Sequence, residues 1–208
     1  MKILICDDHK IVRAGLRQIL NQLEGSNIID EAGNGNEVLM RLSENTFDIL
    51  LLDISLPDKS GLEVLQLVKA KWPLTNVLML SMHPQEQYAI RSLKHGASGY
   101  LTKDAASEEL LLAVKKVAEG GKYISQSLAE NLAYHIDEDT SQQKHEKLSA
   151  REFEIMIKIA TGNSLLEIGS ELFISNKTVS TYRSRIMEKM GMDKNTELTR
   201  YCIENKLI

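Results

Sequence analysis

Acidic side chains follow two short apolar runs of this sequence. The run KILIC ends at Cys6 and is followed by Asp7 and Asp8, and the run DILLL is followed by Asp53. Carboxylates that meet at one point repel each other strongly unless a cation lies between them. Mg²⁺ prefers such oxygen ligands and commonly binds phosphate oxygens at the same time. If the two runs are neighbouring strands, we expect a Mg²⁺ site suited to phosphate chemistry.

A hydroxyl and an ammonium group follow two further apolar runs. Ser81 closes the run NVLMLS, and one residue separates Lys103 from the run GYL. With Asp53 as nucleophile and a metal ion, these are the parts needed to receive and hold a phosphoryl group as an aspartyl phosphate. Taken singly, each residue also fits a helix cap, a turn or a solvated lysine. Their joint position after four strand-like runs favours the functional interpretation.

Five β-rich runs and the helical segments between them must position these residues. The runs cover residues 2–6, 27–31, 48–52, 76–81 and 99–101, and apolar residues recur at helical spacing between them. Strands that alternate with helices imply crossover connections and a parallel sheet covered on both faces. We predict a doubly wound α/β fold with a five-stranded parallel sheet for residues 1–123. In such a sheet, ligands bind at the carboxyl ends of the strands.

The remaining residues indicate a linker and a second domain. Residues 124–146 contain an amphipathic stretch, marked by Leu128, Leu132 and Ile136, and a polar, acidic linker. Residues 147–208 show four helical segments and no strand pattern, which predicts a small all-α domain. The net charge is −2 for residues 1–124, −4 for residues 125–146 and +2 for residues 147–208. The C-terminal domain is therefore the basic part of the chain.

The C-terminal domain contains a helix-turn-helix pattern in which Ser175 is a good N-cap for the second helix. The apolar stripe of that helix consists of Val179, Tyr182, Ile186 and Met190. The residues that must then face outward are Lys177, Ser180, Thr181, Ser184 and Glu188. Residues 177–189 carry a local net charge of +3. Small outward side chains with basic neighbours suit the major groove of DNA, and a helical bundle without nucleic acid is the alternative.

Composition excludes several other classes of protein. The 208 residues are 43% hydrophobic and 26% charged, as in ordinary globular proteins. No apolar run approaches the ~18 residues of a membrane span, and the start MKILIC is too short for a signal peptide, so we expect a cytoplasmic location. Cys6 and Cys202 are far apart and indicate neither a disulfide framework nor a zinc site. Metal-ligand spacing is also missing among the five histidines, His9, His83, His95, His135 and His145.

The first domain resembles the receiver domain of two-component response regulators. The resemblance covers residues 1 to about 123 and lies in the motifs DDH, LLLDISLPDKSG, LS and GYLTK. It implies that Asp53 is the phosphoacceptor and that Asp8 and Asp53 bind Mg²⁺ directly. Asp7 would contribute through water, and the backbone carbonyl of Ser55 would complete the protein ligands.

The same resemblance implies roles for three further residues. Lys103 would pair with the phosphoryl oxygens, Ser81 would form a hydrogen bond with them, and Tyr100 would rotate inward with Ser81. Met82 stands where most receivers carry a small residue, which would narrow access to Asp53 and alter the rates of phosphorylation or hydrolysis. Lys10 stands where Pro is frequent, and this difference affects only the start of a helix.

Residues 147–208 resemble the LuxR-type helix-turn-helix domain of the NarL/FixJ subclass. The shared motifs are LSAREFEIM, EIGSELFIS, KTVSTYRSRIMEKMG and ELTRYCIENKL. The positions that contact bases are then Ser180, Thr181 and Ser184. The positions that hold phosphates are Lys177, Thr178, Arg183 and Arg185. The last helix would serve dimerisation through Leu198, Tyr201 and Cys202.

Two positions of this second domain depart from the family pattern. Gly169 stands where Ala is usual and should cost about 1 kcal/mol of helix stability relative to Ala. Ser180 stands where Lys is common, which implies a different operator preference and one fewer cation.

These resemblances imply a transcriptional regulator switched by phosphorylation. A sensor histidine kinase would donate phosphate to Asp53 with Mg²⁺, and the phosphorylated protein would bind double-stranded DNA as a homodimer, with no membrane partner. The chain is not expected to be an enzyme beyond its own phosphotransfer and dephosphorylation. A haloacid-dehalogenase-type phosphatase would need a second Asp where Ser55 stands. A flavin-binding role is disfavoured because CDDHK would repel the flavin phosphate.

Overall fold

The computed structural model describes the 208 residues except 83–85, 126–128, 130–142 and 206. The chain divides into two compact units, Met1–Tyr134 and His135–Ile208, and each is described by itself below. The predicted amphipathic stretch with Leu128, Leu132 and Ile136 lies outside the described residues, as do His83 and His135. No helix in the described part of the chain has both the length and the apolar character of a membrane span.

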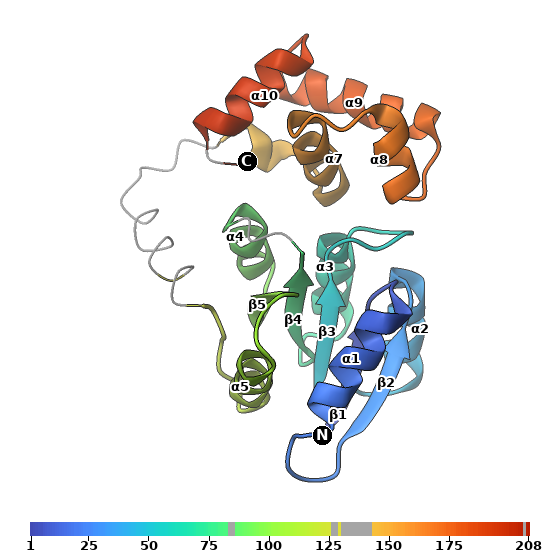
Figure 1. Cartoon of the computed structure of the whole chain (residues 1–208), viewed down its shortest axis with the longest axis vertical. Coiled ribbons are helices and arrows are strands. Elements are labelled where there is room, and N and C mark those ends of the chain that lie inside the picture. The colour runs from blue at the N-terminus through green and yellow to red at the C-terminus, as the bar shows by residue number, and fades with distance from the viewer. Residues whose placement is uncertain (83–85, 126–128, 130–142, 206) are drawn as a thin grey trace. The chain divides into compact units, whose positions relative to one another are not determined.

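The first unit is built on five parallel strands. They are β1 (Lys2–Cys6), β2 (Ile28–Ala32), β3 (Ile49–Asp53), β4 (Asn76–Ser81) and β5 (Gly99–Thr102), in the order β2-β1-β3-β4-β5 (Figure 1). β1 lies beside β3 with Cys6 opposite Leu52, so Asp7 and Asp53 occupy the next position on the two strands. The predicted doubly wound parallel sheet is therefore confirmed, and it brings the acidic strand ends together.

Helices cover both faces of this sheet. α1 (Lys10–Leu20) and α5 (Ser107–Ala118) lie on one face, and α2 (Gly35–Glu44), α3 (Gly61–Lys71) and α4 (Glu86–Lys94) lie on the other (Figure 1). Alternate strand residues face opposite sides, so Ile3 and Ile5 pack toward α1 and α5 while Leu4 is buried on the other side. Burial on both faces is why β1, β3 and β4 are apolar with polar groups only at their ends. The edge strand β2 is only partly buried and carries Asp30 and Glu31.

The chain after α5 closes the edge of β5. The N–H of Tyr123 donates to the carbonyl of Ser98 at 2.9 Å, and the N–H of Tyr100 donates to the carbonyl of Tyr123 at 3.3 Å. Gly99 permits this approach, because a Cβ there would lie 2.6 Å from the Tyr123 carbonyl oxygen. The Tyr100 N–H on this edge strand and the Ser98 carbonyl just before it are thus paired rather than left open.

The second unit contains a short 3₁₀ turn, η1 (Lys144–Lys147), and four α-helices. These helices are α7 (Ala150–Ala160), α8 (Leu165–Glu171), α9 (Asn176–Met190) and α10 (Asn195–Glu204). Ser149 and Ser164 begin α7 and α8 with capping boxes. Each serine hydroxyl accepts the backbone N–H of the glutamate three residues later, and the side chain of that glutamate accepts the backbone N–H of the serine. The all-α second domain predicted from the sequence is therefore confirmed.

One ion pair joins α7 to α9 in the second unit. The Nζ of Lys189 donates to Oε2 of Glu152 at 2.6 Å, and the Glu152 side chain is 4% exposed. Burial alone would raise the pKa of Glu152, but the Lys189 ammonium and the Ser149 backbone N–H outweigh it and lower the pKa. The carboxylate therefore stabilises the fold while it is ionised.

Replacing Lys189 by Met should destabilise the second unit at pH 7 by about 1–2 kcal/mol, less than a fully buried pair because the lysine is 40% exposed. A lowered folded-state pKa gives stability that is present above the unfolded carboxyl pKa and is lost as pH falls through the folded value. The difference from wild type should therefore shrink in acid. Calorimetric unfolding at neutral and acidic pH measures this difference. Lys158→Met, which breaks a pair with the exposed Glu171, is the matched control. Equal losses of unfolding free energy in both variants would contradict a stabilising role for the Lys189–Glu152 pair.

Candidate functional site

A lysine connects two buried carboxylates at the carboxyl ends of the strands. Asp53 ends β3 and is 2% exposed, and Asp7 follows β1 and is fully buried. The Nζ of Lys103, which follows β5, lies 2.7 Å from Oδ2 of Asp53 and 2.6 Å from Oδ2 of Asp7. Three residues that are far apart in the sequence thus form one charged cluster.

Burial and charge act against each other in this cluster. The pKa of Asp53 is raised to about 6, chiefly because burial removes water from the carboxylate, and the neighbouring Asp7 adds to the rise while Lys103 opposes it. Burial would lower the pKa of Lys103, but the two carboxylates raise it. One ammonium therefore does not compensate the buried negative charge, and the site favours a further cation.

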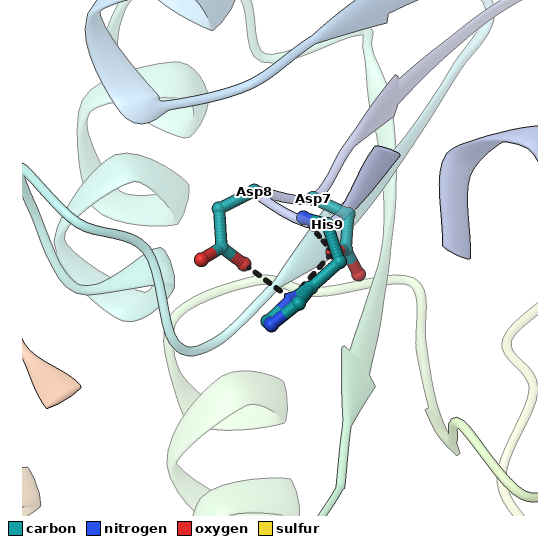
Figure 2. Close-up of side chains that lie close together, drawn as sticks. All are labelled: Asp7, Asp8 and His9. Carbon is teal, nitrogen blue, oxygen red and sulfur yellow. Dashed lines mark hydrogen bonds and ion pairs between the residues drawn. The ribbon is translucent and has the colours of Figure 1, made fainter. Parts of the chain in front are cut away.

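The loop after β1 adds Asp8 and His9 to the cluster. The His9 backbone N–H donates to Oδ1 of Asp7 at 2.8 Å, and its ring Nδ1 lies 2.8 Å from Oδ1 of Asp8 (Figure 2). One possible ligand atom from each of Asp7, Asp8 and His9 lies within 4.8 Å of the others. His9 is not among the site residues predicted from the sequence; its position directly after the acidic pair was the available signal.

The donor set fits a hard divalent cation. Asp7, Asp8 and Asp53 offer carboxylate oxygens, which Mg²⁺ prefers. The loop after β3 folds back on Asp53, since the Ser55 N–H lies 3.3 Å from its Oδ1. Gly61 permits this fold, because a Cβ there would lie 2.0 Å from the Asp53 carbonyl oxygen. α3 therefore begins directly against the strand that carries Asp53.

Ser81 and Tyr100 both lie inside the first unit. Ser81 closes β4 and is 2% exposed, and its carbonyl accepts the N–H of Lys103 at 2.7 Å. Tyr100 is 5% exposed; burial chiefly raises its pKa to about 12, and a hydrogen bond with Ser81 opposes that rise. Met82 is 70% exposed, so its side chain does not pack into the core beneath the site. The Tyr100 side chain therefore lies inside the first unit.

The helices α8 and α9 and the turn between them form the predicted helix-turn-helix of the second unit. The Ser175 hydroxyl accepts the N–H of Thr178 at 3.1 Å, as predicted for an N-cap. Within the helix, Val179, Ile186 and Met190 are buried and Tyr182 is half-buried. The outward-facing residues are exposed as predicted: Lys177, Ser180, Thr181, Ser184 and Glu188. α9 therefore presents small hydroxyl side chains to solvent.

Two of the four basic residues of α9 form bonds within the second unit, and the other two are exposed. Lys189 is paired with Glu152, and Nε of Arg183 donates to Oδ1 of Asn195 in α10 at 2.8 Å. Lys177 and Arg185 are exposed. The local net charge of +3 therefore overstates the positive charge that α9 has available for a phosphate backbone, because Lys189 is paired with Glu152.

The prediction that Leu198 and Cys202 contact a second protomer is wrong. Both side chains are fully buried within the second unit, and the hydroxyl of Tyr201 lies 3.0 Å from Nδ1 of the buried His145. The spacing of these residues marks the face of α10 that packs on its own core. The opposite face carries Thr196, Arg200 and Ile203, which are exposed.

Comparisons with known proteins agree with both units. The model of the response regulator receiver domain matches residues 3–115, and that of bacterial regulatory proteins of the luxR family matches residues 146–202. The oxygen regulatory protein NreC of Staphylococcus haemolyticus is 36% identical over 100% of this chain and 99% of its own length. The NreC of Staphylococcus carnosus is 35% identical over the same shares.

Solved structures of similar proteins cover almost the whole chain. The RcsB response regulator of Salmonella typhimurium has 26% identity and a TM-score of 0.60 over 97% of both chains. A structure of two RcsB dimers bound to two parallel DNAs has 27% identity and a TM-score of 0.60 over 97% of this chain and 96% of that one. The chain belongs to the response regulators with a receiver domain and a LuxR-type domain. It is a phosphorylation-regulated regulator of transcription.

Gly169 has a structural role that its helix propensity does not indicate. A Cβ at this position would lie 2.8 Å from the Ile174 carbonyl oxygen, in the turn between α8 and α9. The Gly169 carbonyl also accepts the N–H of Ile174 at 2.9 Å. Phe173, between them, has a φ of 53°, in the left-handed region. The turn is therefore tighter than alanine permits without a backbone shift.

Gly169→Ala should lower the melting temperature of the second unit, although helix propensity alone would add about 1 kcal/mol of stability. The overlap is with a backbone atom, which cannot move away by a rotamer change. Thermal unfolding followed by calorimetry tests this outcome. Gly162→Ala is not a suitable control because its φ is positive, so Ser170→Ala on the exposed side of α8 serves instead. A rise in melting temperature for Gly169→Ala would show that the turn relaxes freely.

Proposed function

We propose that Asp53 accepts a phosphoryl group from a sensor histidine kinase and that Mg²⁺ is needed for the transfer. The observation that carries this proposal is the bridge of Lys103 between the buried Asp53 and Asp7. Asp8, Asp53 and the Ser55 carbonyl would hold the ion directly, and Asp7 through water. When bound, Mg²⁺ supplies positive charge against the carboxylates and the incoming phosphoryl oxygens.

The chain's own residues perform the remaining chemistry. An oxygen of the Asp53 carboxylate forms the bond to phosphorus as the bond from phosphorus to the kinase histidine breaks. Lys103 is already within hydrogen-bond distance of that carboxylate, so it can transfer its contact to a phosphoryl oxygen. Burial of Asp53 limits the access of water to the acyl phosphate, which is expected to slow its hydrolysis.

Ser81 and Tyr100 would convert phosphorylation into a change of surface. A phosphoryl group adds negative charge and acceptor oxygens at Asp53, so the Ser81 hydroxyl gains a new partner. Its present hydrogen bond with Tyr100 then links the acceptor site to β5. A coupling of roughly 1–3 kcal/mol would change DNA affinity about 5- to 150-fold.

The second unit would read DNA through α9. Ser180, Thr181 and Ser184 are proposed to face base edges in the major groove. The phosphate contacts are proposed for Lys177, Thr178, Arg183 and Arg185. RcsB is described as dimers bound to DNA. For this chain we propose a homodimer through the exposed face of α10, with Ile203 as its apolar centre, and half-sites about one helical turn apart.

Asp53→Asn should abolish labelling by radioactive acetyl phosphate in Mg²⁺, because the amide cannot act as the nucleophile. Chelation of Mg²⁺ should reduce labelling of the wild type in the same way. Asp58→Asn, in the loop beyond the site, is the control and should remain labelled. Undiminished labelling of Asp53→Asn would rule out this acceptor, and steady turnover of a small phosphate ester would contradict the proposal that the chain catalyses only its own phosphotransfer.

Arg185→Ala and Lys177→Ala should each weaken DNA binding by phosphorylated protein about equally on all sequences and reduce the salt dependence of binding by about one ion. Ser184→Ala should instead alter the preferred sequence. Fluorescence anisotropy at several salt concentrations, with a selected operator and a scrambled duplex, separates these effects. Lys158→Ala, on α7, is the charge-matched control, and a loss of affinity equal to that of Arg185→Ala would contradict the role of α9.

A further inference from the structure

A second layer of charged residues holds the loop that carries Asp7 and Asp8. Arg13, near the start of α1, donates from Nη1 to the backbone carbonyl of Asp7 at 2.6 Å. The N–H of Asp7 donates to the carbonyl of Ala32 on β2 at 3.3 Å. The backbone of Asp7 is therefore held on both of its peptide groups, one by a neighbouring strand and one by a side chain.

Glu31 fixes the orientation of Arg13. Glu31 lies in β2, and its Oε2 accepts Nε of Arg13 at 3.0 Å while its Oε1 accepts Nε of Arg17 at 2.7 Å. The hydrogen bond from Arg17, with that from Arg13, lowers the pKa of Glu31 against the effect of burial, so it is ionised at neutral pH. The Arg13 side chain is 12% exposed and the Arg17 side chain 41%. Arg13 is therefore the enclosed and oriented member of the pair.

The carbonyl that Arg13 holds belongs to the peptide between Asp7 and Asp8. Rotation of this peptide would change the directions of both side chains. Two adjacent carboxylates that repel each other favour such a rotation, because the Asp8 side chain, 19% exposed, would gain water by turning outward. A donor fixed on this carbonyl opposes the rotation without itself approaching the ion.

On the basis of the proposed function, we propose that Arg13 is a positioning residue of the phosphorylation site. Arg13 holds the Asp7 carbonyl so that Asp7 and Asp8 both direct their carboxylates toward Mg²⁺, and Glu31 holds Arg13 in turn. The described hydrogen bonds of Arg13 go to Glu31 and to the Asp7 carbonyl, so Arg13 acts through Asp7 and not on Asp53. Groups that orient metal ligands in this way typically contribute about 10- to 100-fold to metal affinity.

The test compares Arg13→Met with Arg17→Met in the full-length protein. Both variants remove an ion pair with Glu31, but only Arg13→Met removes the donor to Asp7. Mg²⁺ affinity is measured without phosphorylation, by titration followed in ¹H–¹⁵N NMR spectra. Arg13→Met should bind Mg²⁺ about tenfold more weakly, and Arg17→Met should change by less than about twofold, as expected for a half-exposed ion pair. Equal affinities in the two variants would overturn the proposal.

Acetyl phosphate labelling supplies a second readout. Arg13→Met should need more Mg²⁺ for half-maximal labelling yet approach the wild-type rate at saturating Mg²⁺, because Asp53 and Lys103 are intact. A merely destabilised protein would lose labelled material at every Mg²⁺ concentration. If wild-type protein is not labelled at all, both the proposed function and the role of Arg13 fail. If wild-type protein is labelled and Arg13→Met shows the same Mg²⁺ dependence, only the role of Arg13 is overturned.

Arg13→Lys keeps the test decisive if Arg13→Met does not fold. Lysine retains the positive charge beside Glu31 but lacks the planar fork that joins the Glu31 carboxylate to the Asp7 carbonyl. Its Mg²⁺ affinity should fall about threefold, less than for a complete loss of the oriented donor. A folded Arg13→Lys protein with wild-type Mg²⁺ affinity would overturn the proposal.

Discussion

The first unit depends on the balance of charge between Asp53, Asp7 and Lys103. Two carboxylates buried beside each other would be strongly unfavourable without a cation, and one ammonium group within ion-pair distance of both makes the arrangement stable. The compensation is incomplete, because the pKa of Asp53 is still raised to about 6. This incomplete balance is the physical reason for proposing a further cation at the site.

The sheet makes this balance possible by bringing the ends of separate strands to one edge. β1 and β3 are neighbours although β2 comes between them in the sequence, and this order brings Asp7 beside Asp53. Side chains covered on both faces of the sheet keep the strand ends in place. Around them, backbone hydrogen bonds to Asp7 and the tight start of α3 at Gly61 fix the loops. The acidic groups are therefore held in position by the fold itself.

In the second unit, side chains of the proposed DNA-binding helix α9 also form bonds that stabilise the fold. Lys189 neutralises Glu152 and Arg183 reaches Asn195, while the hydroxyls of Thr181 and Ser184 donate to carbonyls of their own helix. A small domain has few residues, so one side chain commonly serves both packing and recognition. The exposed Lys177 and Arg185 are the cations of α9 least involved in the fold.

The order of strands and helices can be predicted from the sequence, because apolar residues repeat with the period of each element and turn residues separate them. The residue types at the strand ends and at the Ser175 cap can be predicted in the same way. Which of these residues come into contact depends on how the elements pack. The bridge of Lys103 and the burial of Leu198 and Cys202 depend on elements distant in the sequence. The contact of Arg13 with the Asp7 carbonyl and the close turn at Gly169 are local, but they depend on a backbone geometry that residue spacing does not indicate. Local spacing shows that α10 has an apolar face, but only packing shows that this face lies against its own domain rather than a second protomer.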